Sequence, residues 1–327
     1  MSERSSRHSL LSILTVSSYL KASILPSIQS PLGALPFRFR RPRVLIIGCG
    51  DVGMRTARLL AGRTRVIALT SSPTRRAPFR AAGILPLVGN LDDPATLQRL
   101  AGLAHRVLHL APPAPVGKQD DRTRALMVAL HGRTNPLTLV YGSTSGVYGD
   151  CGGDKVSESR AANARTERAT RRVDAEDHLL HWGKATSTAT CILRIPGIYA
   201  PDREGGTPRT RLLKGVPVLE AAYDVYTNHI HADDLARACF IALWRGKPQR
   251  IYNICDDSEL KMGDYFDLAA ELLGLPKPPR ISPHDAKTML SSMQQSFMGE
   301  SRRLVNTRMK SELRLALRYP TVHSGLI

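Results

Sequence analysis

The sequence lacks a long hydrophobic run and closely spaced cysteines. Crossing a bilayer takes roughly 20 predominantly apolar residues, and the longest candidate, residues 10–20, is interrupted by Ser12, Thr15, Ser17 and Ser18. The five cysteines are scattered without a CxxC motif, which argues against a zinc site and favours reduced thiols over disulfides. We therefore expect a cytoplasmic protein that binds neither a metal nor a membrane.

Acidic residues are also few, because 28 Asp and Glu stand against 46 Lys and Arg, which gives a net charge of +18. Such an excess can indicate a nucleic-acid partner. The densest basic stretch, residues 160–172, contains no aromatic residue on which bases could stack. Most of the basic residues are arginines spread along the chain. We interpret the charge as coding bias, with the phosphates of a small ligand as a second reason, and expect no nucleic-acid partner.

Residues 1–42 differ from the rest of the chain, because they are rich in Ser and Arg and contain one acidic residue, Glu3. Their composition leaves three interpretations open: a disordered tail, a targeting peptide, or sequence upstream of the true start codon. We favour a poorly ordered basic extension.

From residue 43 onward, short apolar runs alternate with helix-like stretches. The runs predict β-strands at residues 44–47, 65–69, 84–88, 107–110, 137–141, 189–194 and 250–254. The stretches predict helices at residues 53–61, 93–103, 168–182, 232–244 and 262–273. Nearly continuous apolar strands are typical of a sheet with helices on both faces. The alternation predicts an α/β protein with a doubly wound parallel sheet, the Rossmann fold.

A glycine-rich loop follows the first predicted strand, with Gly48, Gly50 and Gly53 in the spacing GxGxxG. In this context the first glycine permits a tight turn, the second lets a pyrophosphate approach the backbone, and the third allows close packing of helix and strand. The free N–H groups at the start of the following helix attract the same phosphates. We predict that these glycines, with Asp51 and Val52 between them, bind a dinucleotide.

The end of the second predicted strand bears on which dinucleotide binds. NAD sites usually place an acidic residue there for the ribose 2′-hydroxyl, whereas here Thr70 and two serines end the strand, with Arg75 and Arg76 close behind. No carboxylate would repel a 2′-phosphate, and Arg55 in the helix adds a further cation. We predict NADP in preference to NAD, although both later arginines could also be solvated loop residues.

Five further motifs stand in order along the chain, at residues 88–93, 109–111, 143–149, 194–201 and 228–234. Together with the glycine loop they resemble the NAD(P)-dependent epimerase/dehydratase family, part of the extended short-chain dehydrogenase/reductases, over about residues 43–327. The resemblance implies that Asn90 and Leu91 lie at the adenine, with Asn90 in place of the family's acidic residue. It also implies that Ala111 lies beside the cofactor.

The resemblance locates the family's proton chemistry, which uses a Tyr, a Lys four residues later, and then a helical Glu. With Glu176 as that Glu, the Tyr position holds Arg168 and the Lys position holds Arg172. A guanidinium stays protonated and cannot exchange a proton as a phenol does, although Arg172 could still hold the nicotinamide ribose. Thr144 stands where the family has its catalytic Ser, and it either binds a substrate oxygen or caps the strand end. We predict Thr144, Tyr148 and Arg172 as the catalytic residues of an atypical member.

Residues 43–257 are predicted to form the NAD(P)-binding Rossmann domain, with 195–227 contributing to a small substrate lobe that residues 258–327 complete. The predicted function is that of an NAD(P)-dependent oxidoreductase or epimerase-like protein acting on a small, polar, sugar-nucleotide-like molecule. Arg302, Arg303 and Asn306 could bind an anionic substrate or lie at the surface. The alternative is a cofactor-sensing protein with little chemistry that regulates a partner. A homodimer is left open.

Overall fold

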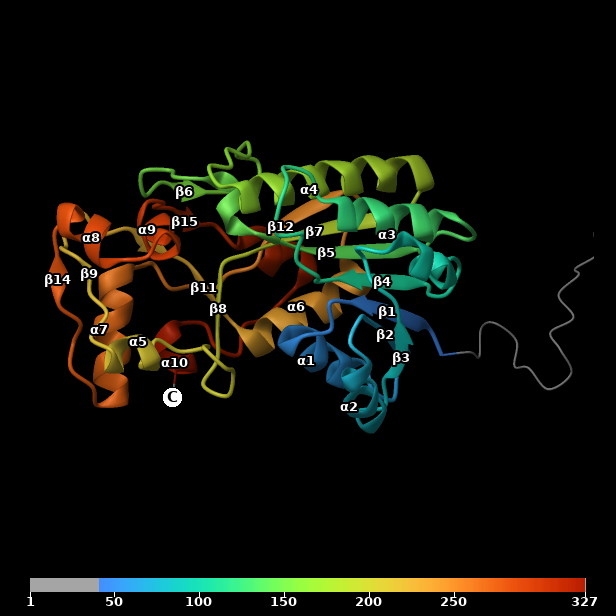
Figure 1. Cartoon of the computed structure of the whole chain (residues 1–327), viewed down its shortest axis with the longest axis horizontal. Helices are drawn as coiled ribbons and strands as arrows, with labels where there is room; N and C mark the ends of the chain where they lie inside the picture. The colour runs from blue at the N-terminus through green and yellow to red at the C-terminus, as the bar shows by residue number, and fades with distance from the viewer. Residues whose placement is uncertain (1–40, 327) are drawn as a thin grey trace, which may run out of the picture. The chain divides into compact units, whose positions relative to one another are not determined.

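A seven-stranded parallel sheet is the main feature of the computed structural model, which describes residues 41–326 apart from the side chains of Ser292, Met293 and Phe297 (Figure 1). Residues 1–40 of the predicted extension lie outside the described residues. Neighbouring strands follow the order β12-β7-β5-β4-β1-β2-β3, and every pair is parallel. The strands are β1 (Arg43–Ile47), β2 (Arg65–Thr70), β3 (Leu85–Val88), β4 (Arg106–His109), β5 (Thr138–Thr144), β7 (Ala189–Ile195) and β12 (Arg250–Asn253). This order confirms the predicted Rossmann fold.

Helices cover both faces of the sheet, because the side chains of each strand alternate between the two faces. The four main helices are α1 (Asp51–Leu60), α3 (Asp121–His131), α4 (Glu167–Thr186) and α6 (Ala232–Arg245). Val44 and Ile46 of β1 face the core shared with α1 and α6, whereas Leu45 and Ile47 face the core shared with α3 and α4. Figure 1 shows these two helix pairs on opposite sides of the sheet.

The helices agree with the prediction to different degrees. The segment predicted as a helix over residues 93–103 forms a shorter 3-10 helix, η3 (Pro94–Leu100). Asp93 caps the start of this helix, because its side chain accepts a hydrogen bond from the Ala95 N–H at 3.2 Å. Helix α3 is absent from the prediction, although Asp120 caps it by accepting from the Thr123 N–H at 3.1 Å. Two very short helical pieces, η2 (Pro73–Arg75) and α2 (Arg76–Ala81), link β2 to β3.

A second hydrophobic core lies apart from the sheet and contains Tyr199, Leu212, Val218, Phe266 and Val322. Its residues come from both segments predicted for the substrate lobe, 195–227 and 258–327. Its helices are α5 (Arg209–Leu213), α7 (Met262–Leu273), α8 (Pro283–Met289), α9 (Ser292–Met298) and α10 (Val322–Gly325). The π-helical turn η5 (Met309–Leu313) instead packs into the sheet core near α6.

Four two-stranded pairings complete the fold and bring distant segments together. They are β6 (Lys155–Val156) with β15 (Arg303–Leu304), β8 (Gly197–Tyr199) with β11 (His229–His231), β9 (Val218–Leu219) with β14 (Arg280–Ile281), and β10 (Tyr226–Thr227) with β13 (Leu260–Lys261). Over residues 41–326, no helix combines the length and the apolar character that a membrane span needs. The same residues hold no group of three or more His, Cys, Asp or Glu suited to a metal ion.

Candidate functional site

The glycine loop joins β1 to α1 and leaves its backbone open to a ligand. Gly48 has a φ of +78°, and a Cβ there would lie 2.3 Å from the Ala111 nitrogen, so only glycine fits this turn. A Cβ on Gly53 would lie 3.3 Å from the Gly48 oxygen, which shows how closely helix and loop approach. At Gly50 a Cβ would meet no atom within 4 Å, and no side chain caps the start of α1. The N–H groups at this helix start therefore face open space that suits a phosphate.

A first cavity, of about 450 Å³, opens beside this loop. Its lining includes five predicted cofactor residues: Gly48, Gly50, Asp51, Val52 and Gly53. Ala111 lies directly behind Gly48 rather than on the lining. The residues present fit the pyrophosphate of a dinucleotide, because backbone donors surround a space that no side chain fills.

Arg75 stands next to the glycine loop. Its Nη2 donates a hydrogen bond to the Cys49 oxygen at 2.7 Å. Its guanidinium carbon lies 4.8 Å from the centre of the Phe79 ring. The loop and the ring together hold this positive charge at the edge of the glycine loop.

The other predicted cofactor residues at the ends of β2 and β3 make local contacts. The Thr70 hydroxyl accepts a hydrogen bond from the Ser72 N–H at 3.2 Å, which stabilises the turn after β2. The Asn90 Oδ1 accepts from the Asp92 N–H at 3.1 Å, and Leu91 packs against the hydrophobic core. None of these three is among the residues that line the first cavity.

Arg55, predicted as a further cation near the cofactor phosphates, forms ion pairs with three aspartates instead. Its side chain is 7% exposed and contacts Asp51, Asp202 and Asp233 at 3.0, 2.7 and 2.6 Å. Because these carboxylates satisfy the guanidinium, Arg55 does not add the further uncompensated cation that the sequence predicted near the cofactor. Arg55 instead joins α1 to the start of α6 and to the loop after β8.

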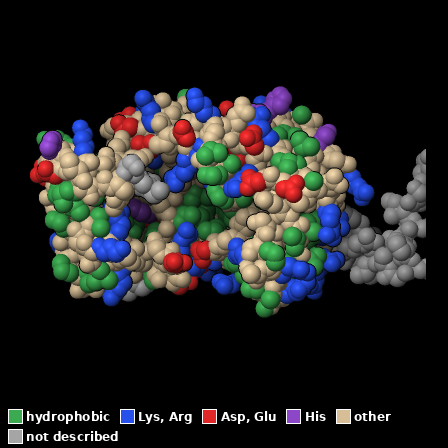
Figure 2. Space-filling view, in the orientation of Figure 1, with side chains coloured by type: hydrophobic (Ala, Val, Ile, Leu, Met, Phe, Trp, Pro, Cys, Tyr) green, Lys and Arg blue, Asp and Glu red, His purple; other side chains and the backbone are tan. Residues whose placement is uncertain are grey.

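A second cavity, of about 610 Å³, adjoins the first. Figure 2 shows this face of the molecule hollowed, with charged side chains at the rim and hydrophobic ones inside. Five residues line both cavities and define what we call the junction: Thr144, Arg168, Pro196, Ile198 and Arg203. A dinucleotide in the first cavity and a small molecule in the second would meet at the junction.

Thr144 occupies the last position of β5. Its Oγ1 accepts a hydrogen bond from the Gly146 N–H at 3.2 Å, which caps the turn η4 (Ser145–Tyr148). A hydroxyl that accepts in this way still has its own proton to donate. Because Thr144 also lines both cavities, the cap and the substrate contact that the sequence offers as alternatives are compatible.

The resemblance predicts two arginines of α4 at the positions of the family's Tyr and Lys. Arg172 donates from Nη1 to the Gly142 oxygen at 2.6 Å and to the Tyr141 hydroxyl at 2.9 Å, and it lines the first cavity. Arg168, one turn earlier, belongs to the junction. Both residues can supply charge and hydrogen bonds, but neither can act as a general acid or base.

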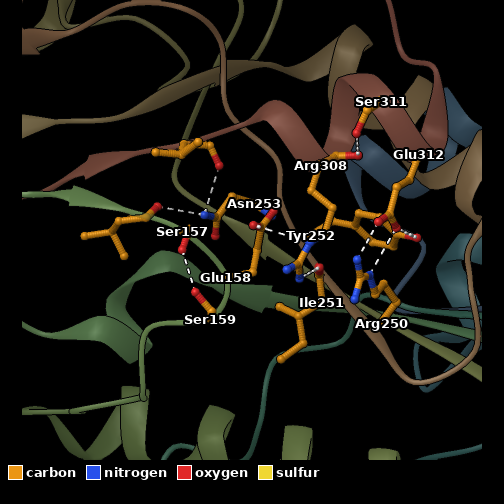
Figure 3. A network of polar contacts seen from close by, with 12 residues as sticks. Ser157, Glu158, Ser159, Arg250, Ile251, Tyr252, Asn253, Arg308, Ser311 and Glu312 are labelled. Atoms are coloured by element: carbon orange, nitrogen blue, oxygen red, sulfur yellow. Dashed lines mark hydrogen bonds and ion pairs between the residues drawn. The ribbon is translucent and has the colours of Figure 1, made fainter.

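Tyr148, predicted as a catalytic residue, lies in the core instead. Its side chain is 1% exposed, and its hydroxyl donates to the Asn253 Oδ1 at 2.8 Å. The Arg194 guanidinium lies 4.6 Å from its ring centre, and burial raises the pKa of the phenol. Asn253 is held in turn by Glu158, which accepts from its N–H at 2.9 Å (Figure 3). Tyr148 therefore stabilises the core and does not reach a substrate.

The sequence prediction misses a buried network behind the junction. Glu176 on α4 pairs with Arg194 on β7 at 2.7 Å, and the two side chains are 3% and 5% exposed. The Ser143 hydroxyl donates to the same carboxylate. Because Ser143 directly precedes Thr144, this network fixes the end of β5. Arg194 was the signal in the sequence that could have revealed this network, because it lies in an otherwise apolar strand. A charge buried between two layers of helices needs a partner.

The second cavity is lined mostly by basic rather than acidic side chains. Its charged lining residues are Arg168, Arg203, Glu300, Arg211 and Arg302. Glu300 pairs with Arg302 at 2.7 Å. The structure thus brings Arg302 into the cavity, whereas Arg303 donates to the Gly153 oxygen and Asn306 to the Cys255 oxygen. The positive excess suits an anionic substrate.

Two further ring side chains of this cavity are uncharged near neutral pH. Burial lowers the pKa of His229 to about 4. Burial also raises the pKa of Tyr199, whose hydroxyl donates to the Thr321 oxygen at 3.1 Å. The positive charge of the second cavity therefore comes from its arginines.

Known proteins share this architecture. A family model described as the NAD dependent epimerase/dehydratase family matches residues 44–255. A solved structure of a functionally unknown conserved protein from Silicibacter pomeroyi is 29% identical, with a TM-score of 0.73, over 87% of this chain and 96% of that one. UDP-glucose 4-epimerase from Thermotoga maritima, solved with UDP-glucose, is 18% identical with a TM-score of 0.71 over the same shares. UDP-glucuronic acid 4-epimerase from Bacillus cereus, solved with NAD, is 17% identical with a TM-score of 0.67, again over 87% and 96%. Among curated proteins, none matches the sequence.

A doubly wound sheet whose glycine loop opens into a cavity defines a dinucleotide-binding protein of the Rossmann class. The family match extends over more than half of the chain. The protein therefore belongs to the NAD dependent epimerase/dehydratase family, and the resemblance found in the sequence is confirmed.

Proposed function

We propose that this protein binds NADP in preference to NAD in the first cavity and acts as an oxidoreductase on a small polar substrate in the second. The observation that carries the proposal is the junction, where both cavities share Thr144 and Arg168. The nicotinamide supplies hydride chemistry when the cofactor is bound. Thr144 donates a hydrogen bond to the substrate oxygen, and Arg168 stabilises negative charge that develops on it. Water exchanges the proton, since neither arginine can.

The size and polarity of the second cavity support a small polar substrate. A volume of about 610 Å³ is within the usual range for a small-molecule site. Two of the relatives named above are epimerases of UDP-sugars. We propose sugar-nucleotide-like molecules as the first substrates to test, in a screen that follows NADPH consumption after calorimetric titration with NAD and NADP.

Thr144→Val should leave the affinity for NADP within about twofold of the wild type and lower the turnover roughly a hundredfold. Valine keeps the shape of threonine but loses the hydroxyl, at a position that lines both cavities. The lost cap on Gly146 should cost about 1 kcal/mol of stability, which a thermal melt would measure. Thr144→Ser is the matched control and should keep most of the activity. Full turnover in the valine variant would exclude Thr144 from catalysis.

Arg75→Gln should weaken NADP binding about tenfold to a hundredfold and change NAD binding little. The reason is the loss of a charge-assisted contact to the 2′-phosphate, worth about 1.5–3 kcal/mol. Calorimetry with both coenzymes measures the difference. Arg76→Gln is the control, because it removes the same charge from the adjacent position. Equal losses for NAD and NADP would show that Arg75 holds the loop rather than the 2′-phosphate.

A second function remains in competition, because Arg168 and Arg172 replace the Tyr and Lys of the family. A protein that binds NADP without exchanging protons suits cofactor sensing, with the bound coenzyme changing the affinity for a partner. Tight NADP binding together with no hydride transfer across the substrate screen would favour this function over the first.

A further inference from the structure

Arg211 is a largely buried cation without a counter-charge. It comes from α5 and lines the second cavity. Its Nε is buried and has no hydrogen-bond partner, and no carboxylate of residues 41–326 forms an ion pair with it. Its guanidinium carbon lies 4.4 Å from the centre of the Phe266 ring. Burial accordingly lowers the pKa of Arg211. Desolvating a guanidinium without a partner costs free energy, which a bound anion would offset.

Other arginines of the same cavity are better compensated. Arg302 donates to Glu300 and to the Gly149 oxygen, both at 2.7 Å. Arg203 lies 3.5 Å from Asp51. Of these three arginines, Arg211 alone has no carboxylate of residues 41–326 within ion-pair distance, although Arg302 Nε and Arg203 Nη1 are likewise buried without a hydrogen-bond partner.

We infer that Arg211 binds a carboxylate group of the substrate, on the part of the second cavity wall that α5 contributes. The inference rests on the proposed function, because it treats the second cavity as the substrate site. Figure 1 shows α5 beside α7 and apart from β5, which carries Thr144, so the carboxylate is remote from the reacting carbon. The planar fork of a guanidinium matches a carboxylate with two parallel hydrogen bonds.

The surroundings of Arg211 favour a singly charged group over a phosphate. One unbalanced guanidinium matches one negative charge, and Arg203 and Arg302 of the same cavity already have carboxylate partners, so they contribute less to balancing a doubly charged phosphate. The adjacent wall is formed by Met262, Tyr265 and Phe266, which suits an apolar or ring-shaped body next to the carboxylate. The inference therefore narrows the substrate of the second cavity to a carboxylic acid whose apolar or ring portion lies against α7, in place of the sugar-nucleotide-like molecules with which the screen begins.

The test titrates the full chain with benzoate, with its neutral analogue benzamide and with phenyl phosphate, with and without saturating NADP. Wild type should bind benzoate at least tenfold more tightly than benzamide, and more tightly than phenyl phosphate. Arg211→Gln should remove the preference for benzoate, while Arg209→Gln, on the exposed side of the same helix, should keep it. Arg211→Lys should retain part of it, since it keeps the charge without the fork.

Thermal melting of the unliganded variants separates recognition from a structural role. Removing an unbalanced cation should leave the melting temperature of Arg211→Gln equal to that of wild type or higher, so a variant that fails to fold would contradict the inference. Tighter binding of phenyl phosphate, the absence of any benzoate binding, or a preference that survives Arg211→Gln would overturn it. Because the titration also runs without NADP, a failure to bind the coenzyme would overturn the proposed function without deciding the role of Arg211.

Discussion

Gly50→Asp is expected to abolish measurable binding of NAD and NADP while the chain stays folded. A side chain fits at this position, because a Cβ on Gly50 would meet no atom within 4 Å. The new carboxylate would stand where the backbone receives the pyrophosphate. Two like charges about 4 Å apart repel by about 4 kcal/mol at an effective dielectric constant near 20, which is roughly a thousandfold in affinity. Calorimetric titration with each coenzyme measures the loss.

Gly50→Ala separates the added charge from the added bulk. Its methyl group meets open space in the unliganded chain, so we expect binding within about tenfold of wild type and an unchanged melting temperature. Gly48 would be a poor site for the same experiment, since a Cβ there lies 2.3 Å from the Ala111 nitrogen and would disturb the fold itself. If Gly50→Asp bound NADP as tightly as wild type, the dinucleotide would not lie over this loop, and the proposed function would fail.

The sheet was predictable from the sequence because its central strands are buried on both faces. Such strands appear as continuous apolar runs, and β1, with Val44, Leu45, Ile46 and Ile47 all fully buried, is the clearest case. Short elements were not predictable in the same way. The two-residue strands β6 and β15 exist only because segments about 150 positions apart along the chain pair with each other, and no local pattern records such a pairing.

The same difference between local and distant contacts decides which parts of the site were predictable. The glycine loop could be predicted because its demands are local: a turn, an open backbone and a helix start within six residues, Gly48 to Gly53. Tyr148 was misjudged because its partners, Asn253 and Arg194, come from β12 and β7. Arg211 was not singled out in the sequence, because its buried Nε without a hydrogen-bond partner can be recognised only in the folded chain.

Arg194→Met is expected to destabilise the protein by about 3–5 kcal/mol, the usual result of removing one partner from a buried ion pair. Arg194 and Glu176 lie 2.7 Å apart and are 5% and 3% exposed. Without Arg194, the Glu176 carboxylate stays buried with the Ser143 hydroxyl as a remaining donor. Methionine fills much of the same volume, so lost packing contributes less. The melting temperature should fall by roughly 10 °C.

Adding Glu176→Gln to Arg194→Met separates the orphaned charge from other effects. Glutamine can still accept from the Ser143 hydroxyl but carries no charge, so the double variant should be clearly more stable than Arg194→Met alone. Equal instability of the two would show that packing over the Tyr148 ring, and not the buried carboxylate, dominates.

The double variant should also separate coenzyme binding from turnover. The glycine loop follows β1 and does not depend on this pair, so the affinity for NADP should be unchanged. Ser143 directly precedes Thr144, so the loss of the pair should displace the Thr144 hydroxyl and lower the turnover. A parallel loss of both would mean that the pair supports the whole sheet rather than the position of the Thr144 hydroxyl.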